Sequence, residues 1–221
     1  MTTPSWIIDL DNTLYRADTH LFDQIDVRMG RYIADMFKVD RVEARRIQKD
    51  YFLAYGTTLS GLIDQHDIDP HPFLEFVHDI DVSPIPQDPH LKDALTALPG
   101  QRYIYTNGSY GHAQRVLDHL GLAHIFDGIF DIAAAQFEAK PALSAMERCV
   151  NVFGIAPQSA TMIDDMAKNL EPAAAMGMHT VWIDTGSPWA AEGHGPHIKE
   201  TATCLKSWLQ KTTFKTEDTL Q

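Results

Sequence analysis

The chain has 221 residues, of which 44% are hydrophobic, and this length suffices for one large domain or for a core domain with a smaller insert. Its 18 basic and 30 acidic residues give a formal net charge of −12, which argues against general binding to nucleic acids or anionic membranes. No apolar run is long enough to span a membrane, and residues 1–5 lack a signal-peptide pattern. Cys149 and Cys204 are the only cysteines, and they favour reduced thiols over a disulfide framework. We therefore expect a cytoplasmic protein.

A short buried strand is predicted close to the N-terminus, where residues 6–10 contain four apolar side chains. The strand runs into Asp11-Asn12-Thr13, whose side chains end strands and start turns. Because strand side chains alternate, we expect Asp9 and Asp11 to point to the same side and to raise each other's pKa unless a cation lies between them. A hard divalent ion such as Mg²⁺ suits such a pair, and the alternative is a plain strand followed by a turn.

Helical periodicity follows, with no strand interrupting it. Four helices are predicted from Phe22 to Phe37, from Arg41 to Tyr55, from Thr57 or Thr58 through Ile63, and from Pro70 or Pro72 through Val77. The proline-rich segment 81–89 is typical of a stiff linker. Helices without a strand between them do not extend a sheet, so residues 17–86 are predicted to be an inserted helical unit.

Strands and helices alternate after this unit. The predicted strands are residues 102–105, 128–132, 161–163 and 180–183, and the predicted helices are residues 91–98, 113–120, 141–153 and 169–176. This order predicts a parallel sheet with right-handed crossovers, formed by residues 1–16 and 87–221. The tail from Gly186 is predicted to be a surface loop, followed by a short helix over 202–209 and frayed residues after it.

Polar side chains occur at three further places in this alternating pattern: after two of the predicted strands and just before one of the predicted helices. Thr106-Asn107-Gly108 forms either a cradle for a phosphoryl group or an ordinary turn. Lys140 lies just before a helix, where it either reaches a phosphate oxygen or is merely solvated. The adjacent acids Asp164 and Asp165 are costly at a strand end unless they are solvated or bind a metal, and Asn169 follows one helical turn later. Strand ends are where open α/β sheets bind ligands.

In this order, the four sites resemble the four motifs of the haloacid dehalogenase superfamily, which here read Asp9-Leu10-Asp11-Asn12-Thr13, Thr106-Asn107, Lys140 and Asp164-Asp165. The resemblance covers nearly all of the chain up to about Ile183. It implies a doubly wound parallel sheet with a Rossmann-like core. It also implies an all-α cap between the first and second motifs, where residues 17–86 fall.

The resemblance implies a phosphohydrolase that forms an aspartyl-phosphate. In that reading Asp9 is the nucleophile, and Asp11 is the general acid that protonates the leaving oxygen and then the base that activates water. Mg²⁺ is held by the Asp9 side chain, the Asp11 backbone carbonyl and Asp165, with Asp164 acting through water. Thr106, Asn107 and Lys140 bind the phosphate.

Within the superfamily, the run Tyr55-Gly56-Thr57-Thr58-Leu59 and the segment 122–130 resemble the pyrimidine 5′-nucleotidase branch. This resemblance implies removal of the 5′-phosphate from UMP or CMP by a monomer or homodimer. Tyr55, Thr57 and Thr58 then become candidates for substrate specificity in the cap. Capping of a helix is the alternative role for Thr57 and Thr58.

Four other functions stay open at this stage. A dehalogenase is disfavoured because its chemistry uses no acid at the position of Asp11 and no metal. A broad phosphatase would act on sugar phosphates, phosphoglycolate or pyridoxal phosphate. A phosphomutase would keep water away from the phosphorylated Asp9, and a non-catalytic nucleotide-binding module would bind without turnover.

Overall fold

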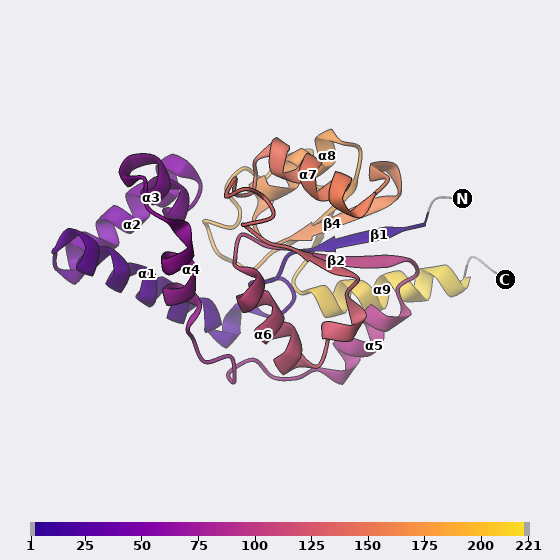
Figure 1. The fold of residues 1–221 in the computed structure, drawn as a ribbon. Helices are drawn as coiled ribbons and strands as arrows, with labels where there is room; N and C mark the ends of the chain where they lie inside the picture. The colour runs from indigo at the N-terminus through magenta and orange to yellow at the C-terminus, as the bar shows by residue number, and fades with distance from the viewer. Residues whose placement is uncertain (1–2, 219–221) are drawn as a thin grey trace.

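The computed structural model in Figure 1 describes residues 3–218, with side chains described as far as residue 212. Over these residues the strands form one six-stranded sheet in the order β3-β2-β1-β4-β5-β6, with every neighbouring pair parallel. The strands are β1 (Ser5–Ile8), β2 (Gln101–Tyr105), β3 (Gly128–Phe130), β4 (Ala160–Asp164), β5 (His179–Ile183) and β6 (Glu200–Ala202). Crossovers run to both sides of β1, so the predicted doubly wound α/β fold is confirmed.

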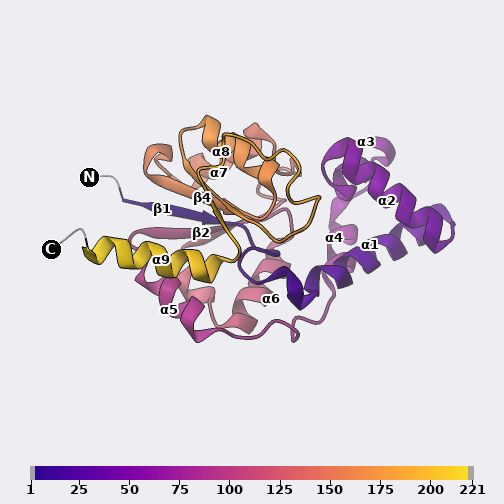
Figure 2. The ribbon, with the colours of Figure 1, turned by 180° about the vertical axis from the view of Figure 1, so that it is seen from behind.

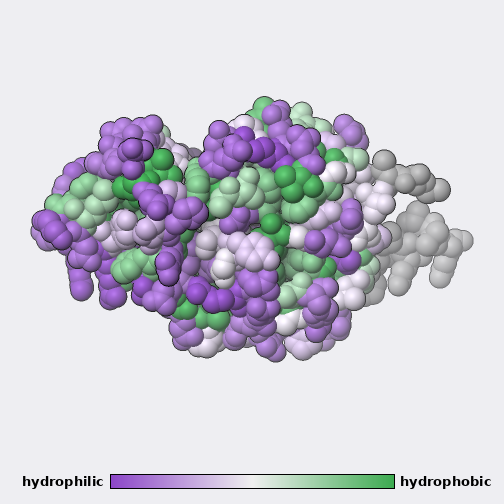
Figure 3. Space-filling model, viewed as in Figure 1, coloured by the Kyte–Doolittle hydropathy of each residue, from purple (hydrophilic) through white to green (hydrophobic). Residues whose placement is uncertain are grey.

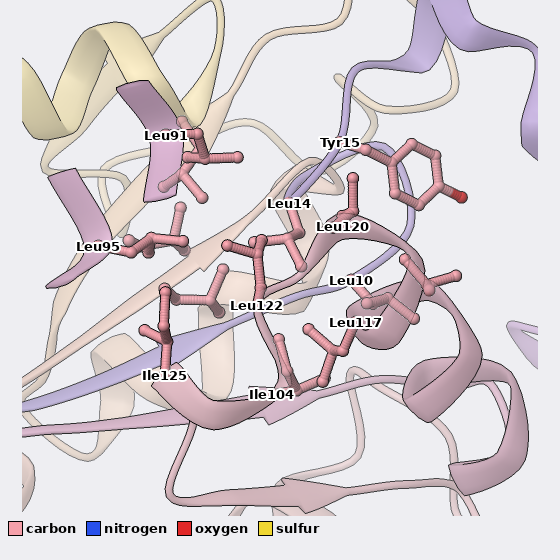
Figure 4. Packing of buried hydrophobic residues seen from close by; sticks show 14 of the residues in the cluster. Leu10, Leu14, Tyr15, Leu91, Leu95, Ile104, Leu117, Leu120, Leu122 and Ile125 are labelled. Atoms are coloured by element: carbon pink, nitrogen blue, oxygen red, sulfur yellow. The ribbon is translucent and has the colours of Figure 1, made fainter. Parts of the chain in front are cut away.

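Helices cover both faces of this sheet (Figures 1 and 2). On one face lie α5 (Pro89–Ala97), α6 (Tyr110–Leu120) and α9 (Leu205–Asp218), and on the other lie α7 (Leu143–Phe153) and α8 (Glu171–Ala175). Because side chains alternate along a strand, Ile8 packs into the hydrophobic cluster of the first face and Ile7 into that of the second. Figure 4 shows part of the first cluster, where apolar side chains from β2, from the segment after β1 and from the helices gather.

A group of four helices stands at one end of the sheet (Figures 1 and 2), as the periodicity predicted. The helices are α1 (Leu21–Phe37), α2 (Arg41–Tyr55), α3 (Thr58–His66) and α4 (Pro70–His78). They share a hydrophobic cluster that includes Ile33, Leu62 and Phe73. Residues 9–20 and 79–88 connect the group to the sheet. Leu21 and Ile85 pack into the cluster of the sheet itself, so the boundaries at residues 17 and 86 stay predictions.

The run from Tyr55 to Gly61 holds α3 against α2. Thr57 caps α3, because its Oγ1 accepts a hydrogen bond from the Ser60 N–H at 3.0 Å. The buried Thr58 hydroxyl donates to the Gln48 carbonyl at 3.2 Å. A Cβ at Gly61 would lie 2.5 Å from the Cβ of Tyr51, so only glycine allows this close helix contact. These contacts support the capping role of Thr57, whereas Thr58 bonds α3 to α2 instead of capping a helix.

The C-terminal part departs most from the sequence predictions. The tail after Gly186 contains β6, which pairs with β5 and adds an edge strand, so the prediction of a loop alone was wrong. The last helix runs to Asp218, well past the predicted end at residue 209, and residues 219–221 lie outside the described part. The helix predicted over 169–176 is a 3₁₀ turn (Ala167–Leu170) followed by α8, whose second residue is proline.

The surface, the helix lengths and the cysteines can be described for the same residues. Hydrophilic residues cover much of the helical group on the face shown in Figure 3, with smaller apolar areas between them. Among the described residues, no helix combines the length and apolarity needed to cross a membrane. Cys149 is buried and Cys204 half-buried, and both are free thiols, as predicted.

Candidate active site

Three strand ends that are distant in sequence meet at the centre of the sheet. β1 lies between β2 and β4, so Asp9, Thr106 and Asp164 end neighbouring parallel strands at the same edge. The Asp9 N–H donates to the Ile163 carbonyl at 2.9 Å, which extends the pairing of β1 with β4 by one residue. Parallel strands therefore deliver the predicted site residues to one place, as open α/β sheets commonly do.

Lys140 joins all three of these strand ends. Its Nζ donates to Asp9 Oδ1 at 2.6 Å, to Asp164 Oδ2 at 2.7 Å and to the Tyr105 carbonyl at 3.0 Å. These bonds use all three hydrogens of the ammonium, and Lys140 as a residue is only 3% exposed. Lys140 therefore lies among the predicted site residues, but in this structure it bridges carboxylates, so its predicted contact with phosphate stays a prediction.

The residues after β2 fix the backbone around this lysine. The Lys140 N–H donates to Asn107 Oδ1 at 2.8 Å, so the amide of Asn107 connects the end of β2 to the Lys140 segment. The Thr106 hydroxyl is buried and accepts a hydrogen bond from the Gly108 N–H at 2.9 Å. Both residues lie directly after β2, as predicted. One oxygen of each side chain accepts a hydrogen bond from the backbone of the site loops.

The two acids after β4 differ sharply in their contacts. Asp164 is fully buried, and its Oδ1 accepts bonds from the Met166 N–H at 2.8 Å and from Asn169 Nδ2 at 3.0 Å, while its Oδ2 accepts the bond from Lys140. The carboxylate of Asp165 accepts no hydrogen bond from the described residues, and only its backbone carbonyl is bonded, to Trp182 Nε1 at 2.7 Å. Asp165 therefore has an unused carboxylate beside the site.

Asp9, Asp164 and Asp165 each offer a carboxylate oxygen within 4.8 Å of the others, close enough to share one metal ion. Burial raises the pKa of Asp9 to about 7, against the lowering effect of Lys140 and with a further increase from Asp164. Burial, Asp9 and Asp164 likewise raise the pKa of Asp165 well above its usual range. Burial alone would lower the pKa of Lys140, but Asp164 and Asp9 outweigh it and keep the ammonium charged.

The Asp11 side chain does not belong to this acidic group. Its Oδ1 accepts hydrogen bonds from the Tyr15 hydroxyl at 2.6 Å and from His112 Nε2 at 2.8 Å. Burial alone would raise the pKa of Asp11, but His112 and Tyr15 outweigh it and lower this pKa to about 2. The prediction that Asp9 and Asp11 raise each other's pKa was therefore wrong for Asp11, whose neighbours are hydrogen-bond donors, while Asp11 is only a minor cause of the raised pKa of Asp9.

Sequence reasoning missed Tyr15, His112 and His78. Tyr15 lies four residues after Asp11, beyond a turn that contains Asn12 in a left-handed conformation with φ of 64°. His112 lies in the first turn of α6, the helix that follows β2, and its ring stacks on that of His78 with centroids 4.5 Å apart. A polar ring on the buried face of a helix that starts at the site edge is the one signal the sequence offered.

Two aromatic side chains connect the helical group to the sheet near these acids. The Phe52 ring of α2 meets the Trp189 ring with centroids 6.3 Å apart, and Lys168 Nζ lies 5.0 Å from the Phe52 ring centroid. Lys168 follows Asp165 by three residues, and the Ala167 N–H donates to the Ala190 carbonyl at 2.8 Å. The half-exposed Trp189 is thereby fixed to the segment that carries Asp165. Of the predicted cap residues, Tyr55 packs on Tyr51 of its own helix.

Comparisons with known proteins agree with this geometry. A family model described as haloacid dehalogenase-like hydrolase matches residues 6–177. Phosphate metabolism protein 8 of Saccharomyces cerevisiae is 30% identical over 196 residues, which cover 78% of this chain and 59% of the relative. The fructose-1-phosphate phosphatase YqaB of Escherichia coli is 30% identical over 129 residues, which cover 54% of this chain and 65% of the relative. The chain thus spans less than two thirds of the length of either relative.

Solved structures share the fold. The protein YfnB from Bacillus subtilis, determined bound to magnesium, superimposes with a TM-score of 0.63 at 13% identity, over 96% of this chain and 99% of that one. At this identity the likeness shows the fold alone.

Proposed function

The chain belongs to the haloacid dehalogenase-like hydrolases, and from this premise we propose that it hydrolyses phosphomonoesters through a phosphorylated Asp9. The strongest support is the buried cluster in which Lys140 Nζ lies 2.6 Å from Asp9 and 2.7 Å from Asp164, beside the unpaired carboxylate of Asp165. Lys140 occupies only Oδ1 of Asp9, so Oδ2 is available to attack phosphorus. The dehalogenase alternative is disfavoured by Asp11, which that chemistry does not use.

The reaction has two steps. In the first, an Asp9 oxygen attacks phosphorus, the bond to the leaving oxygen breaks, and Asp11 gives that oxygen a proton. In the second, water attacks phosphorus, Asp11 takes the proton of that water, and the bond to Asp9 breaks to release inorganic phosphate. Asp11 has a pKa of about 2 in the protein without substrate. A phosphate dianion beside it raises this pKa, which favours the protonated form that the first step needs.

The acidic residues fit a hard divalent cation, and we infer Mg²⁺. Asp9, Asp165 and the backbone carbonyl of Asp11 would hold it. Asp164 would act through water, because Lys140, Asn169 and the Met166 N–H already occupy its oxygens. When bound, the ion would offset the negative charge of the transferring phosphoryl group.

The affinity for Mg²⁺ is expected to rise with pH between about pH 5 and about pH 8, because protons must leave the carboxylates before they bind a cation. The pKa of Asp9 is raised to about 7 and that of Asp165 is raised well above its usual range, so a fraction of these groups is protonated below neutral pH. Titration calorimetry in two buffers of different ionisation enthalpy would measure the protons released. Constant affinity without proton release would contradict this ligand set.

We propose that α1–α4 form a cap over the site, within residues 17–86. The support is their own hydrophobic cluster, which Ile132 from the segment after β3 also joins, the two connections to the sheet, and the contact of Phe52 with Trp189. Because α2 reaches the segment after Asp165, the cap is in place to touch the leaving group of a substrate bound at Asp9.

For the substrate we propose a pyrimidine nucleoside 5′-monophosphate, UMP or CMP. The resemblance of the run from Tyr55 to Leu59 supports this choice, as does the half-exposed Trp189 ring beside Phe52, on which a planar base can stack. The E. coli relative is by name a sugar phosphate phosphatase, so fructose 1-phosphate and related sugar phosphates are the second candidate class.

Replacing Trp189 with alanine is expected to raise KM for UMP by about 3- to 10-fold, the value of one lost aromatic contact. KM for ribose 5-phosphate, which has no base, should change much less. Trp189→Phe should restore most of the affinity for UMP, and Leu53→Ala, an exposed change on α2 next to Phe52, is the control. Equal changes for both substrates would remove Trp189 from base recognition.

The proposal as a whole is tested by phosphate release from nucleoside monophosphates, sugar phosphates, phosphoglycolate and pyridoxal phosphate, with Mg²⁺ and with EDTA. A preference for UMP and CMP that EDTA abolishes is the expected result. Metal-dependent hydrolysis of another phosphate would discard the pyrimidine assignment and retain the chemistry. Formation of a sugar bisphosphate would indicate a phosphomutase, and tight nucleotide binding without turnover would indicate a non-catalytic module.

We also infer a cytoplasmic location, which the two free thiols support. The partner would be a small phosphorylated metabolite. A monomer or homodimer stays a prediction.

A further inference from the structure

Two histidine rings lie face to face between the helical group and the sheet. His78 is the last residue of α4, and His112 lies in the first turn of α6. Their ring centroids are 4.5 Å apart and their planes differ by 11°. His78 is 6% exposed and His112 is 1% exposed, so this is an interior contact.

His112 fixes the orientation of the Asp11 carboxylate. His112 Nε2 and the Tyr15 hydroxyl both donate to Oδ1 of Asp11, at 2.8 Å and 2.6 Å. No bond from the described residues reaches Oδ2, so the two donors hold one oxygen and leave the other for proton transfer. Because Nε2 donates to a carboxylate, it carries the ring hydrogen, and the buried Nδ1 of His112 has no partner. The one hydrogen bond of this ring is therefore directed at Asp11.

The ring of His78 packs against one face of the His112 ring, and His78 is itself hydrogen-bonded to residues of α6 and of its N-cap. Its Nδ1 accepts a hydrogen bond from the Ser109 hydroxyl at 3.0 Å, and its backbone carbonyl accepts one from the Arg115 guanidinium. Ser109 Oγ also accepts a bond from the His112 N–H at 3.3 Å, which ties the two histidines through one hydroxyl. A Cβ at Gly108 would lie 3.3 Å from the His112 ring and 3.5 Å from the His78 ring, so glycine lets the loop pass beside the pair.

We propose that His112 is a positioning residue for Asp11, and that His78 supports it from the last turn of the helical group. The position of α4 is thereby coupled to the orientation of the residue that handles the proton. This inference rests on the proposed function, because it assigns Asp11 the role of acid and base. His112 acts through Asp11 and makes no contact with the reacting atoms.

The test compares two leaving groups in the first turnover. An alkyl phosphate such as UMP needs a proton on its leaving oxygen, whereas p-nitrophenyl phosphate releases a stable phenolate that needs none. His112→Phe keeps a flat ring beside His78 and removes the donor to Asp11. We expect its first-turnover rate to fall by about 100-fold on the alkyl phosphate and by less than about 5-fold on p-nitrophenyl phosphate, with KM nearly unchanged.

Three further variants separate positioning from general support of the fold. His112→Gln retains an N–H donor and should regain most of the lost rate. His112→Phe added to Asp11→Asn should cost nothing further, because both changes remove the same function. His78→Ala should show the same dependence on leaving group, at about a tenfold loss. His124→Phe, a change at an exposed histidine, is the control.

Equal losses on both phosphates, or a full additional loss in the Asp11→Asn background, would overturn the positioning role of His112. An unchanged His78→Ala would overturn the coupling to α4. If the unmodified protein hydrolyses neither phosphate, the proposed function itself is wrong. If the unmodified protein is active and only the variants behave otherwise than expected, the inference about His112 is wrong and the proposed function stands.

Discussion

Asp9→Asn protein is expected to release phosphate at least about 10⁴-fold more slowly than the unmodified protein, because an amide oxygen cannot replace a carboxylate as the nucleophile. Asp9 ends the central strand, is 6% exposed, and bonds to Lys140 through Oδ1 only. Asparagine has nearly the same volume, so the surrounding packing should persist. Steady-state phosphate release from the best substrate of the panel, with Mg²⁺, measures the effect.

Two controls make this result decisive. Asp118→Asn, at an exposed position of α6, should leave the rate unchanged. Circular dichroism and urea unfolding of the Asp9→Asn protein would exclude a loss of folded protein as the cause. If Asp9→Asn retained more than about a tenth of the activity in a preparation free of contaminating phosphatase, the nucleophile would have to be another residue.

Lys140→Met is expected to destabilise the protein by about 3 kcal/mol near pH 8 in EDTA, because it leaves the carboxylates of Asp9 and Asp164 buried without their cation. Lys140 is 3% exposed and makes three hydrogen bonds at this point. Loss of this cation removes the lowering effect of Lys140 and raises the pKa of Asp9 further in the folded state. An acid whose pKa is raised by folding opposes folding increasingly as pH rises from its unfolded pKa to its folded one. The deficit of the variant should therefore be smaller near pH 5.5 than near pH 8.

Urea unfolding at these two pH values measures the deficit, and Lys211→Met, at an exposed position of α9, is the control. Excess Mg²⁺ should stabilise Lys140→Met more than it stabilises the unmodified protein, since a cation can replace part of the lost charge. Equal stability of the variant and the unmodified protein at both pH values would mean that the ion pairs of Lys140 contribute nothing to folding.

Much of the fold was predictable because it depends on local signals. The four helices before residue 79 follow from apolar spacing, from the cap Thr57, whose Oγ1 accepts a hydrogen bond in the structure, and from Pro70 at the start of the fourth helix. The alternation of strand and helix after residue 88 follows from the change of hydrophobic period. The edge strand β6 was missed because three residues, Glu200–Ala202, carry no alternating pattern, and only pairing with β5 makes them a strand.

The meeting of the predicted site residues was predictable, but their hydrogen bonds and pKa values were not. Asp9, Asp164 and Asp165 meet because neighbouring strands of one parallel sheet end at the same edge, and Lys140 reaches them from the segment before α7. The hydrogen bonds of each carboxylate were not predictable. Asp164 rather than Asp165 accepts them because Asn169 and Lys140 lie beside Asp164 in the folded chain. The protonation of Asp11 was predicted in the wrong direction, because its donor His112 is 101 positions away in the chain.

Local patterns in the chain were enough to indicate where polar residues interrupt apolar strands, which helices form, and that the ends of neighbouring strands converge, since hydrophobic period and helix caps act over a few residues. Contacts between distant elements set which oxygen each donor contacts, which carboxylate stays unpaired, and how His78 meets His112 beside Asp11. Electrostatic and hydrogen-bond energies vary over ångströms and with burial, and both quantities are set by packing between elements that lie far apart along the chain.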